Sequence, residues 1–355
     1  MHGYLQMKNS ILILIIAFIL IQCDLNKNDD SKNNNIDFSG IYCLNLNNIE
    51  MTIIQTGEDV TFTVQKDFLM DGTGTINGDT LVLNATTSGG ELFSCRLTLL
   101  EDDLGFSGSF QIEDNTGNIT VNGILLGYKG ACEIYDIDIN EIPKFVEADF
   151  TQLSKIDKIS KFRSGFGHSY TDMTEDCRSM KHYFNPYQNY RENNTVEIYS
   201  PVNGTIVSLL NDYEGSNNDL KNIEIQIRSD EQPAFIFDIF HCDLISSDIS
   251  MGKEVQAGEL LGYATLYYDT WQEYVTSFDI AVWVNTPYGT RLVSYFETLN
   301  DNVFNNYISR GIPLRENFII QKELRDSNPL ECAGYQGQEF VTEGELDNWV
   351  ILNSP

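Results

Sequence analysis

Short runs of β-branched and aromatic residues alternate with turn residues along the first third of the chain, and this alternation limits the folds open to it. Residues 51–54 and 80–83 are such runs, and turn residues rich in Gly, Asp and Asn stand at 57–59 and 77–79. Short strands at regular spacing predict an up-and-down meander that closes as a small β-barrel or sandwich. We therefore expect residues 38–139 to form an all-β domain, serving as a spacer or a ligand-binding module.

The rest of the chain divides by its apolar pattern into three segments. Between residues 140 and 160 apolar residues recur at roughly helical spacing, which predicts a connecting helix. Residues 161–300 return to β-rich runs and predict a second β domain. Residues 301–355 combine prolines with apolar anchors, and we expect a C-terminal extension packed on the second domain. The expected fold class is all-β in both domains.

The N-terminus has the pattern of an export signal. Lys8 precedes an uninterrupted apolar run at 11–21, which is too short for a comfortable membrane span. Residues 1–22 are therefore predicted to be a signal peptide. The four residues that end at Cys23 resemble a bacterial lipoprotein lipobox, which makes Cys23 the predicted lipidation site; an ordinary cleaved signal peptide is the alternative. Residues 23–37 are polar and predict a flexible tether, so we expect an exported protein, lipid-anchored to a membrane of the bacterial cell envelope.

Charge and cysteine content restrict the partners. The formal net charge of −30, from 52 acidic and 22 basic residues, argues against nucleic acid and against electrostatic docking to anionic lipid. Of 7 cysteines, those other than Cys23 form an even set, which is typical of disulfides in an exported protein. Cys43 with Cys95 is one candidate pair, and free buried thiols are the alternative.

Residues able to carry chemistry gather in the second domain. His168 and Asp172 stand four positions apart after a Gly-rich approach, and His241 ends an apolar run far downstream. Ser277 and Asp279 alternate with apolar neighbours, so both side chains point to one face of a predicted strand while the neighbours point to a core. Imidazoles and carboxylates in this arrangement predict a metal-centred site on a β scaffold.

The order of these motifs resembles the lysostaphin/LytM-type zinc endopeptidases, which cut peptidoglycan cross-bridges and share the duplicated hybrid motif fold. The resemblance runs from His168 through a strand–turn–strand at 200–207 to His241, and then through a Gly-punctuated hairpin at 251–262 to Asp279. The hairpin is its strongest part, because three glycines at fixed offsets meet tight turns that a Cβ would obstruct. The resemblance implies a LytM-like fold for the second domain.

The resemblance also implies roles for five residues. His168 and Asp172 match metal ligands of the family, and Asp279 stands where the family has a ligating histidine. His241 matches one of the two histidines that orient the water and stabilise the intermediate, and Ser277 replaces the other. A set of one histidine and two carboxylates implies zinc or another divalent metal, such as Mn²⁺ or Ca²⁺.

Replacement of two expected histidines leaves three functions open. In the first, the domain is a catalytically degenerate relative that binds peptidoglycan or its peptide cross-links, with an envelope protein as a further partner. In the second, it is an active zinc-dependent peptidoglycan endopeptidase with altered metal ligation. In the third, it is a non-enzymatic surface binding or scaffold protein. His182, in a segment absent from the family pattern, is a candidate accessory residue of the site; a surface or core histidine is the alternative.

Overall fold

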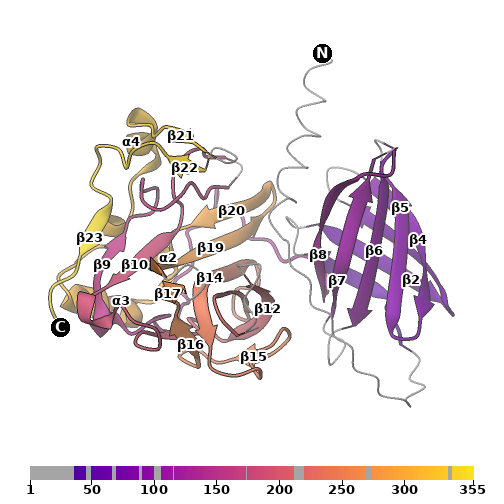
Figure 1. Ribbon diagram of the computed structural model, residues 1–355, viewed down its shortest axis with the longest axis horizontal. Helices are drawn as coiled ribbons and strands as arrows, with labels where there is room; N and C mark the ends of the chain where they lie inside the picture. The colour runs from indigo at the N-terminus through magenta and orange to yellow at the C-terminus, as the bar shows by residue number, and fades with distance from the viewer. Residues whose placement is uncertain are drawn as a thin grey trace. The chain divides into compact units, whose positions relative to one another are not determined.

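The computed structural model has two compact units, one ending at Cys132 and the other running from Glu133 to the C-terminus (Figure 1). Among the described residues, no helix is both long and apolar enough to cross a bilayer. The predicted signal peptide, the lipidation site Cys23 and most of the tether lie outside the described residues. The structure describes residues 36–355 except 45–48, 66–68, 88–89, 100–104, 115, 173, 212–219, 269–272 and 335–337.

The first unit is a closed up-and-down β-barrel, which confirms the fold predicted from its alternating runs. Its strands are β1 (Gly40–Leu44), β2 (Glu50–Thr56), β3 (Asp59–Gln65), β4 (Leu69–Asn77), β5 (Thr80–Thr86), β6 (Leu92–Leu99), β7 (Gly105–Glu113) and β8 (Ile119–Lys129). Each strand pairs antiparallel with the next, and β1 closes the barrel against β8.

Alternate side chains fill the barrel. In β5, Leu81, Leu83 and Ala85 are buried while the residues between them keep more exposed surface. A barrel of about eight strands is just wide enough for side chains to fill its interior. The fit is tight at Gly72, where a Cβ would lie 2.3 Å from the ring of Phe62. The barrel interior is therefore an apolar core.

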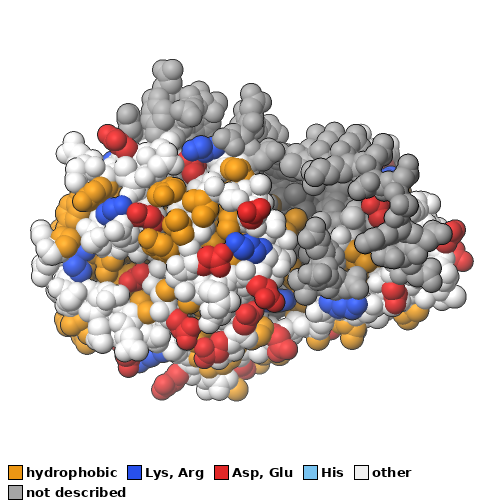
Figure 2. Space-filling view, turned by 90° about the horizontal axis from the view of Figure 1, so that it is seen from below, with side chains coloured by type: hydrophobic (Ala, Val, Ile, Leu, Met, Phe, Trp, Pro, Cys, Tyr) orange, Lys and Arg blue, Asp and Glu red, His pale blue; other side chains and the backbone are white. Residues whose placement is uncertain are grey.

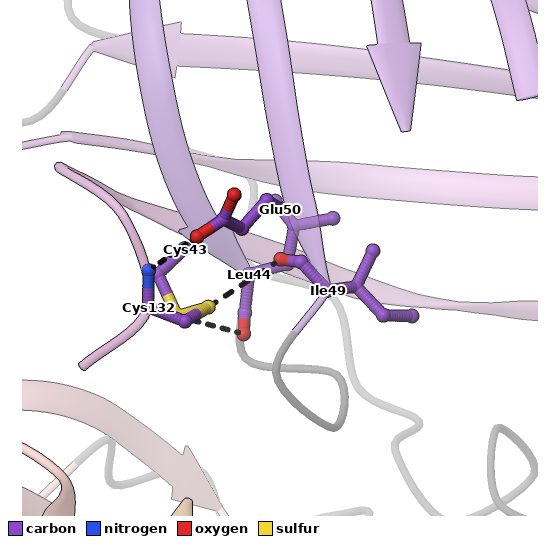
Figure 3. The surroundings of a disulfide bond; sticks show 5 residues. All are labelled: Cys43, Leu44, Ile49, Glu50 and Cys132. Atoms are coloured by element: carbon purple, nitrogen blue, oxygen red, sulfur yellow. Dashed lines mark hydrogen bonds between the residues drawn. A yellow bond between two sulfur atoms is a disulfide. The ribbon is translucent and has the colours of Figure 1, made fainter. Parts of the chain in front are cut away.

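A disulfide joins Cys43 to Cys132, whose amide also donates a hydrogen bond to the Glu50 carboxylate at 2.9 Å (Figure 3). The candidate pair of Cys43 with Cys95 is wrong, because the two residues face opposite sides of the barrel wall. Both neighbours of Cys43 in β1 are buried and Cys43 between them is only half-buried. Cys95 instead points inwards as a buried free thiol.

The second unit is built around an eleven-stranded sheet (Figure 1). Its elements are β9 (Ile156–Ser160), β10 (His182–Pro186), β11 (Glu197–Tyr199), β12 (Gly204–Asn211), β13 (Ile223–Ser229), β14 (Phe235–Leu244), β15 (Glu254–Val255), β16 (Leu260–Ala264), β17 (Tyr267–Tyr268), β18 (Glu273–Tyr274), β19 (Phe278–Thr286), β20 (Gly289–Val293), α2 (Tyr295–Thr298), α3 (Asp301–Ser309), α4 (Lys322–Ser327), β21 (Cys332–Ala333), β22 (Glu339–Phe340), β23 (Trp349–Ile351) and the 3₁₀ helices η2 (Leu153–Lys155), η3 (Gln188–Tyr190) and η4 (Arg315–Phe318). The sheet runs in the order β15-β12-β13-β14-β19-β10-β9-β23, with β16 pairing both β11 and β14 and with β20 beside β19. Strands β17 and β18, and likewise β21 and β22, form separate pairs.

The central strands bury one face in the large hydrophobic cluster of the second unit, which we call the main core. They present polar groups on the other face, which we call the polar face. In β13, Ile223, Ile225 and Ile227 belong to the main core, and the residues between them are half-buried. In β19, Phe278 and Ile280 belong to the same core, as their alternation with Ser277 and Asp279 predicted.

Residues 140–160 do not form the predicted connecting helix. Apart from the short η2 and the strand β9, these residues form neither a helix nor a strand. The amides of Phe145 and Val146 donate to the distant Thr298 carbonyl, at 2.9 and 3.0 Å, instead of to a carbonyl one helical turn back. Phe145, Val146 and Phe150 are buried in the main core. The apolar spacing therefore reflects contacts with the sheet and not one face of a helix.

Two further features link distant segments of the second unit. The hairpin glycines Gly252 and Gly258 have φ of +82° and +81°, and a Cβ on Gly262 would lie 2.2 Å from a backbone oxygen of β14, as expected for positions that need glycine. At the C-terminus, β23 pairs with β9, and a disulfide joins Cys177 to Cys332.

Removing the barrel disulfide, by Cys43→Ala with Cys132→Ala, is expected to destabilise the first unit by roughly 2–5 kcal/mol, because the crosslink closes a long loop of the unfolded chain. All 3 tryptophans lie in the second unit. Urea unfolding should therefore begin earlier by far-UV circular dichroism and stay unchanged by tryptophan fluorescence. The matched pair Cys177→Ala with Cys332→Ala should instead shift the fluorescence transition. An early fluorescence change in the barrel variant would contradict the assignment.

Candidate functional site

A β-bulge in β14 places His241 on the polar face. The register against β13 shifts between Ile223 and Ile225, opposite the bulge. Ile239 before the bulge and Cys242 after it both enter the main core, so the extra residue leaves His241 turned away from that core. His241 has a φ of +61°, in the left-handed region that non-glycine residues rarely occupy.

Asn222 holds the imidazole ring from the neighbouring strand end. Its Oδ1 lies 2.9 Å from Nδ1 of His241, and Asn222 itself has a φ of +53°. The backbone amide of Asn222 donates to the Asp243 carboxylate at 3.1 Å, and Lys221 pairs with the same carboxylate at 2.6 Å. Left-handed non-glycine residues cost about 1–3 kcal/mol each and persist where their surroundings fix them, often at functional sites. The two strained residues therefore mark this corner as a candidate site.

Asp279 pairs with Lys181. The Nζ of Lys181 lies 2.5 Å from Oδ2 of Asp279, and both side chains are at most 3% exposed. The Oδ1 of Asp279 lies 3.5 Å from Nε2 of His241. Burial alone lowers the pKa of Lys181, but the attraction of Asp279 outweighs it, so the pKa is raised and Lys181 stays a cation.

Three aromatic rings surround the Lys181 ammonium. Its Nζ lies 3.9 Å from the ring centre of Phe240, 4.6 Å from that of Tyr170 and 5.4 Å from that of Tyr183. Ring faces attract cations, by about 2 kcal/mol or more where water is excluded. Asp279 and the rings together offset the loss of water around Lys181.

His168 is exposed and senses the charges of the same centre. Its Nδ1 lies 3.1 Å from the Ser169 carbonyl, and the residue keeps exposed surface. The pKa of His168 is lowered to about 4, first because the surrounding protein partly desolvates the ring and then because Lys181 is near. Asp279 and His241 also act on this ring. The structure thus brings His241 and Asp279 together beside Lys181, and all three act electrostatically on His168.

Asp172 serves another part of the fold. Its Oδ1 accepts hydrogen bonds from the amide and hydroxyl of Thr174, at 2.8 and 2.6 Å. Its Oδ2 accepts from the Leu292 amide at 3.0 Å and from the Arg291 guanidinium at 3.2 Å. Both oxygens of Asp172 therefore fix the loop after His168 to β20.

Ser277 and His182 have different surroundings. Ser277 is buried immediately before β19. The Nδ1 of His182 lies 2.8 Å from the Ser160 carbonyl, and its Nε2 lies 2.8 Å from Ser294 Oγ. The ring is 1% exposed and packs edge-on against Phe296. His182 is therefore a core histidine and does not join the group around Lys181.

This geometry does not fit the metal-ligand set that the resemblance implied. A cation already lies 2.5 Å from the Asp279 carboxylate, and Asp172 is held elsewhere by Arg291 and backbone amides. Within the described part of the chain, no group of three or more His, Cys, Asp or Glu side chains is arranged to hold a metal ion. The expected triad of His168, Asp172 and Asp279 is not assembled.

Lys181 and Asp238 are site residues that the sequence reasoning missed. Asp238 lies in β14, is 1% exposed, and accepts hydrogen bonds from the Tyr170 hydroxyl at 3.1 Å and from the Trp283 indole at 3.3 Å. A signal was present for Asp238, because its charge stands alone in an otherwise apolar run. A charged residue that is buried with such a run requires a partner.

No protein-family model matches this chain, and no curated protein matches it. Among solved structures it is similar to Helicobacter pylori Csd3 in an orthorhombic crystal, at 10% identity and a TM-score of 0.29, covering 74% of this chain and 56% of that one. It is also similar to Csd3 in a hexagonal crystal, at 11% identity and a TM-score of 0.27, covering 74% of this chain and 80% of that one. Likeness of this extent does not establish a shared activity.

Lys181→Met is expected to lower the free energy of unfolding of the second unit by roughly 3–5 kcal/mol, because Asp279 would stay buried without a counter-charge. Adding Asp279→Asn to this variant should recover much of the loss. Urea unfolding followed by tryptophan fluorescence measures both effects. If the double variant loses as much free energy of unfolding as the two single variants lose together, the two side chains do not stabilise each other.

His182 is expected to make stability fall in acid. Burial lowers its pKa from 6.5 to about 4, so between these values the unfolded chain binds a proton that the folded protein does not. Stability should therefore decrease as the pH falls from about 6.5 towards about 4. His182→Gln should show a weaker pH dependence of the urea midpoint than the unchanged protein. Equal slopes in the two proteins would contradict this account.

Proposed function

We propose that this chain is a cell-envelope lipoprotein whose second unit binds peptidoglycan without cleaving it. We infer the lack of cleavage from one observation. The Nζ of Lys181 lies 2.5 Å from Asp279 Oδ2, beside the carboxylate that would otherwise bind a metal. A metal ion at Asp279 would leave Lys181 buried without its counter-charge, which is strongly destabilising. In this proposal the domain is a catalytically degenerate relative of the LytM-type endopeptidases.

The choice of peptidoglycan is supported by the order of motifs from His168 to Asp279, which resembles that family. The apolar run at 11–21 and Cys23 support export and a lipid anchor in the envelope. A peptide-bearing polymer in the same compartment is a fitting ligand for a domain tethered in this way.

The polar face supports a binding role. Tyr170 and Trp283 are half-buried there, and so are the polar residues that alternate along β13. Aromatic rings beside a few placed polar groups are typical of surfaces that bind small molecules and peptides. Each ring nitrogen of His241 lies near a protein oxygen, so the ring is held by contacts within the chain.

An active zinc-dependent endopeptidase is the second candidate, and one observation favours it. The Nε2 of His241 lies 3.5 Å from Asp279 Oδ1, and both groups act electrostatically on His168. This function requires Lys181 to leave Asp279 when the metal binds.

Sedimentation with isolated peptidoglycan separates the two candidates. We expect the mature chain, made soluble by Cys23→Ser, to co-sediment equally with added zinc or with a chelator, and to release no new amines. His241→Ala should bind as the unchanged protein does, because the interaction needs no catalytic imidazole. Zinc-dependent amine release that His241→Ala abolishes would establish the endopeptidase instead. If the protein does not co-sediment with peptidoglycan under either condition, the third function, a non-enzymatic surface scaffold protein, would remain.

A further inference from the structure

A cavity of about 960 Å³ opens in the second unit, and its described lining includes none of the residues that surround Lys181. The lining comes from within residues 137–144, 162–163, 291–297 and 301–323. Ligand cavities in proteins typically measure about 300–1,000 Å³. This cavity is therefore large enough for a ligand of the size of a short peptide, and the proposed function makes no use of it.

Basic side chains gather around this cavity. The whole chain has 22 Lys and Arg against 52 Asp and Glu, whereas the lining holds five of each kind. The five basic residues are Lys144, Arg163, Arg291, Arg315 and Lys322. The cavity is therefore locally neutral in a protein whose net charge of −30 repels anions. An anionic group meets less repulsion here than the composition of the chain predicts.

Arg291 presents an incompletely bonded guanidinium to the cavity. Its Nε donates to Oδ2 of Asp172 at 3.2 Å, and Asp172 is 6% exposed and lies outside the described lining. The side chain of Arg291 keeps 23% of its surface exposed. Among the described residues, no acceptor bonds to its two terminal nitrogens. Asp172 therefore fixes the guanidinium from behind and leaves its terminal N–H donors to the cavity.

Arg178 shows that one guanidinium of this unit can hold two carboxylates at once. Its Nη1 donates to Glu175 at 2.7 Å, and its Nη2 donates to Asp326 at 2.9 Å. The planar guanidinium presents parallel N–H donors that match the two oxygens of a carboxylate. Arg291 has the first carboxylate, that of Asp172, and its remaining donors suit a second one.

Arg315 adds a second fixed guanidinium to the lining. Its Nη2 donates to the Leu299 carbonyl at 3.0 Å and to the Asp301 carboxylate at 2.9 Å. The guanidinium carbon lies 4.2 Å from the centre of the Phe304 ring, which holds the group by a cation–π contact. Arg315 therefore contributes positive charge to the cavity from a position that the chain itself fixes.

We propose that this cavity binds the C-terminal carboxylate of a short peptide, with Arg291 as the anchor. Leu292 and Ile319 offer apolar contacts to the adjoining side chain of such a ligand, and the amides of Asn305 and Gln321 offer hydrogen bonds to its peptide groups. A fatty acid would leave these amides unused, and a doubly charged phosphate would be repelled more strongly by the acidic half of the lining. The site is separate from the polar face on which the proposed function depends.

The test uses the full mature chain with Cys23→Ser and the probe Nα-acetyl-leucyl-leucine, whose only charge is its C-terminal carboxylate. Isothermal titration calorimetry measures its affinity and that of the matching C-terminal amide. We expect saturable binding of the acid, and binding of the amide that is weaker by about tenfold or more, as expected for the loss of charge-assisted hydrogen bonds. General electrostatics cannot imitate this result, because a net charge of −30 favours the neutral amide.

Two conservative variants locate the site. Arg291→Lys keeps the positive charge and the pairing with Asp172 but loses the planar pair of terminal nitrogens, so the acid should bind about tenfold more weakly or worse. Arg191→Lys is the matched control, because Arg191 is a half-buried arginine outside the described lining that bonds to Asn185 and to the Pro186 carbonyl. Its affinity for the acid should stay unchanged. Urea midpoints followed by tryptophan fluorescence check that both variants are folded.

Three outcomes would overturn the proposal: no saturable binding of the acid, equal affinity for the acid and the amide, or equal weakening by Arg291→Lys and Arg191→Lys. If Arg291→Lys does not fold, the comparison of acid with amide on the unchanged protein still decides. Sedimentation with peptidoglycan is read independently. A protein that binds the polymer but does not distinguish the acid from the amide would refute the carboxylate site and leave the proposed function standing.

Discussion

The buried ion pair between Lys181 and Asp279 is the interaction on which the centre of the second unit depends. Removing two charges from water costs several kcal/mol for each ion, and the mutual attraction offsets this only where the geometry is favourable. Here the Nζ–Oδ2 distance is 2.5 Å and three rings face the ammonium. The pair joins the approach to β10 with β19, and His241 of β14 lies 3.5 Å from the same carboxylate. Loss of either charge would therefore disturb three central strands at once.

The fold was predictable where the signal was local. The turn residues and alternating runs of residues 38–139 predict the barrel, and the hairpin glycines occupy the strained turns expected of them. The helix predicted at residues 140–160 is wrong, because the apolar residues there are spaced by their contacts with a distant sheet and this spacing resembles that of a helix. The pairing of Cys43 depended on which side of the barrel wall Cys95 faces, and the sequence alone did not specify the register that decides it.

The candidate site was predictable in part for the same reason. His241 lies 3.5 Å from Asp279, and alternation correctly predicted that Asp279 points away from the core that holds Phe278 and Ile280. It could not show that Lys181 would reach Asp279, since that contact depends on how β10 pairs with β19. It also could not show that a bulge would turn His241, or that Arg291 would take Asp172. Each of these depends on a contact between residues far apart in the chain.

Because the whole protein carries an excess of acidic charge, buried groups and not surface groups decide which cation it can distinguish. Acidic side chains are dispersed over the face shown in Figure 2, with basic ones among them, and the net charge of −30 attracts any cation. Such attraction is screened beyond about 8 Å at physiological ionic strength and does not distinguish one cation from another. Discrimination therefore requires groups with fixed positions and little water around them. Asp279 meets that condition, and the buried ammonium group of Lys181 already occupies the position beside it.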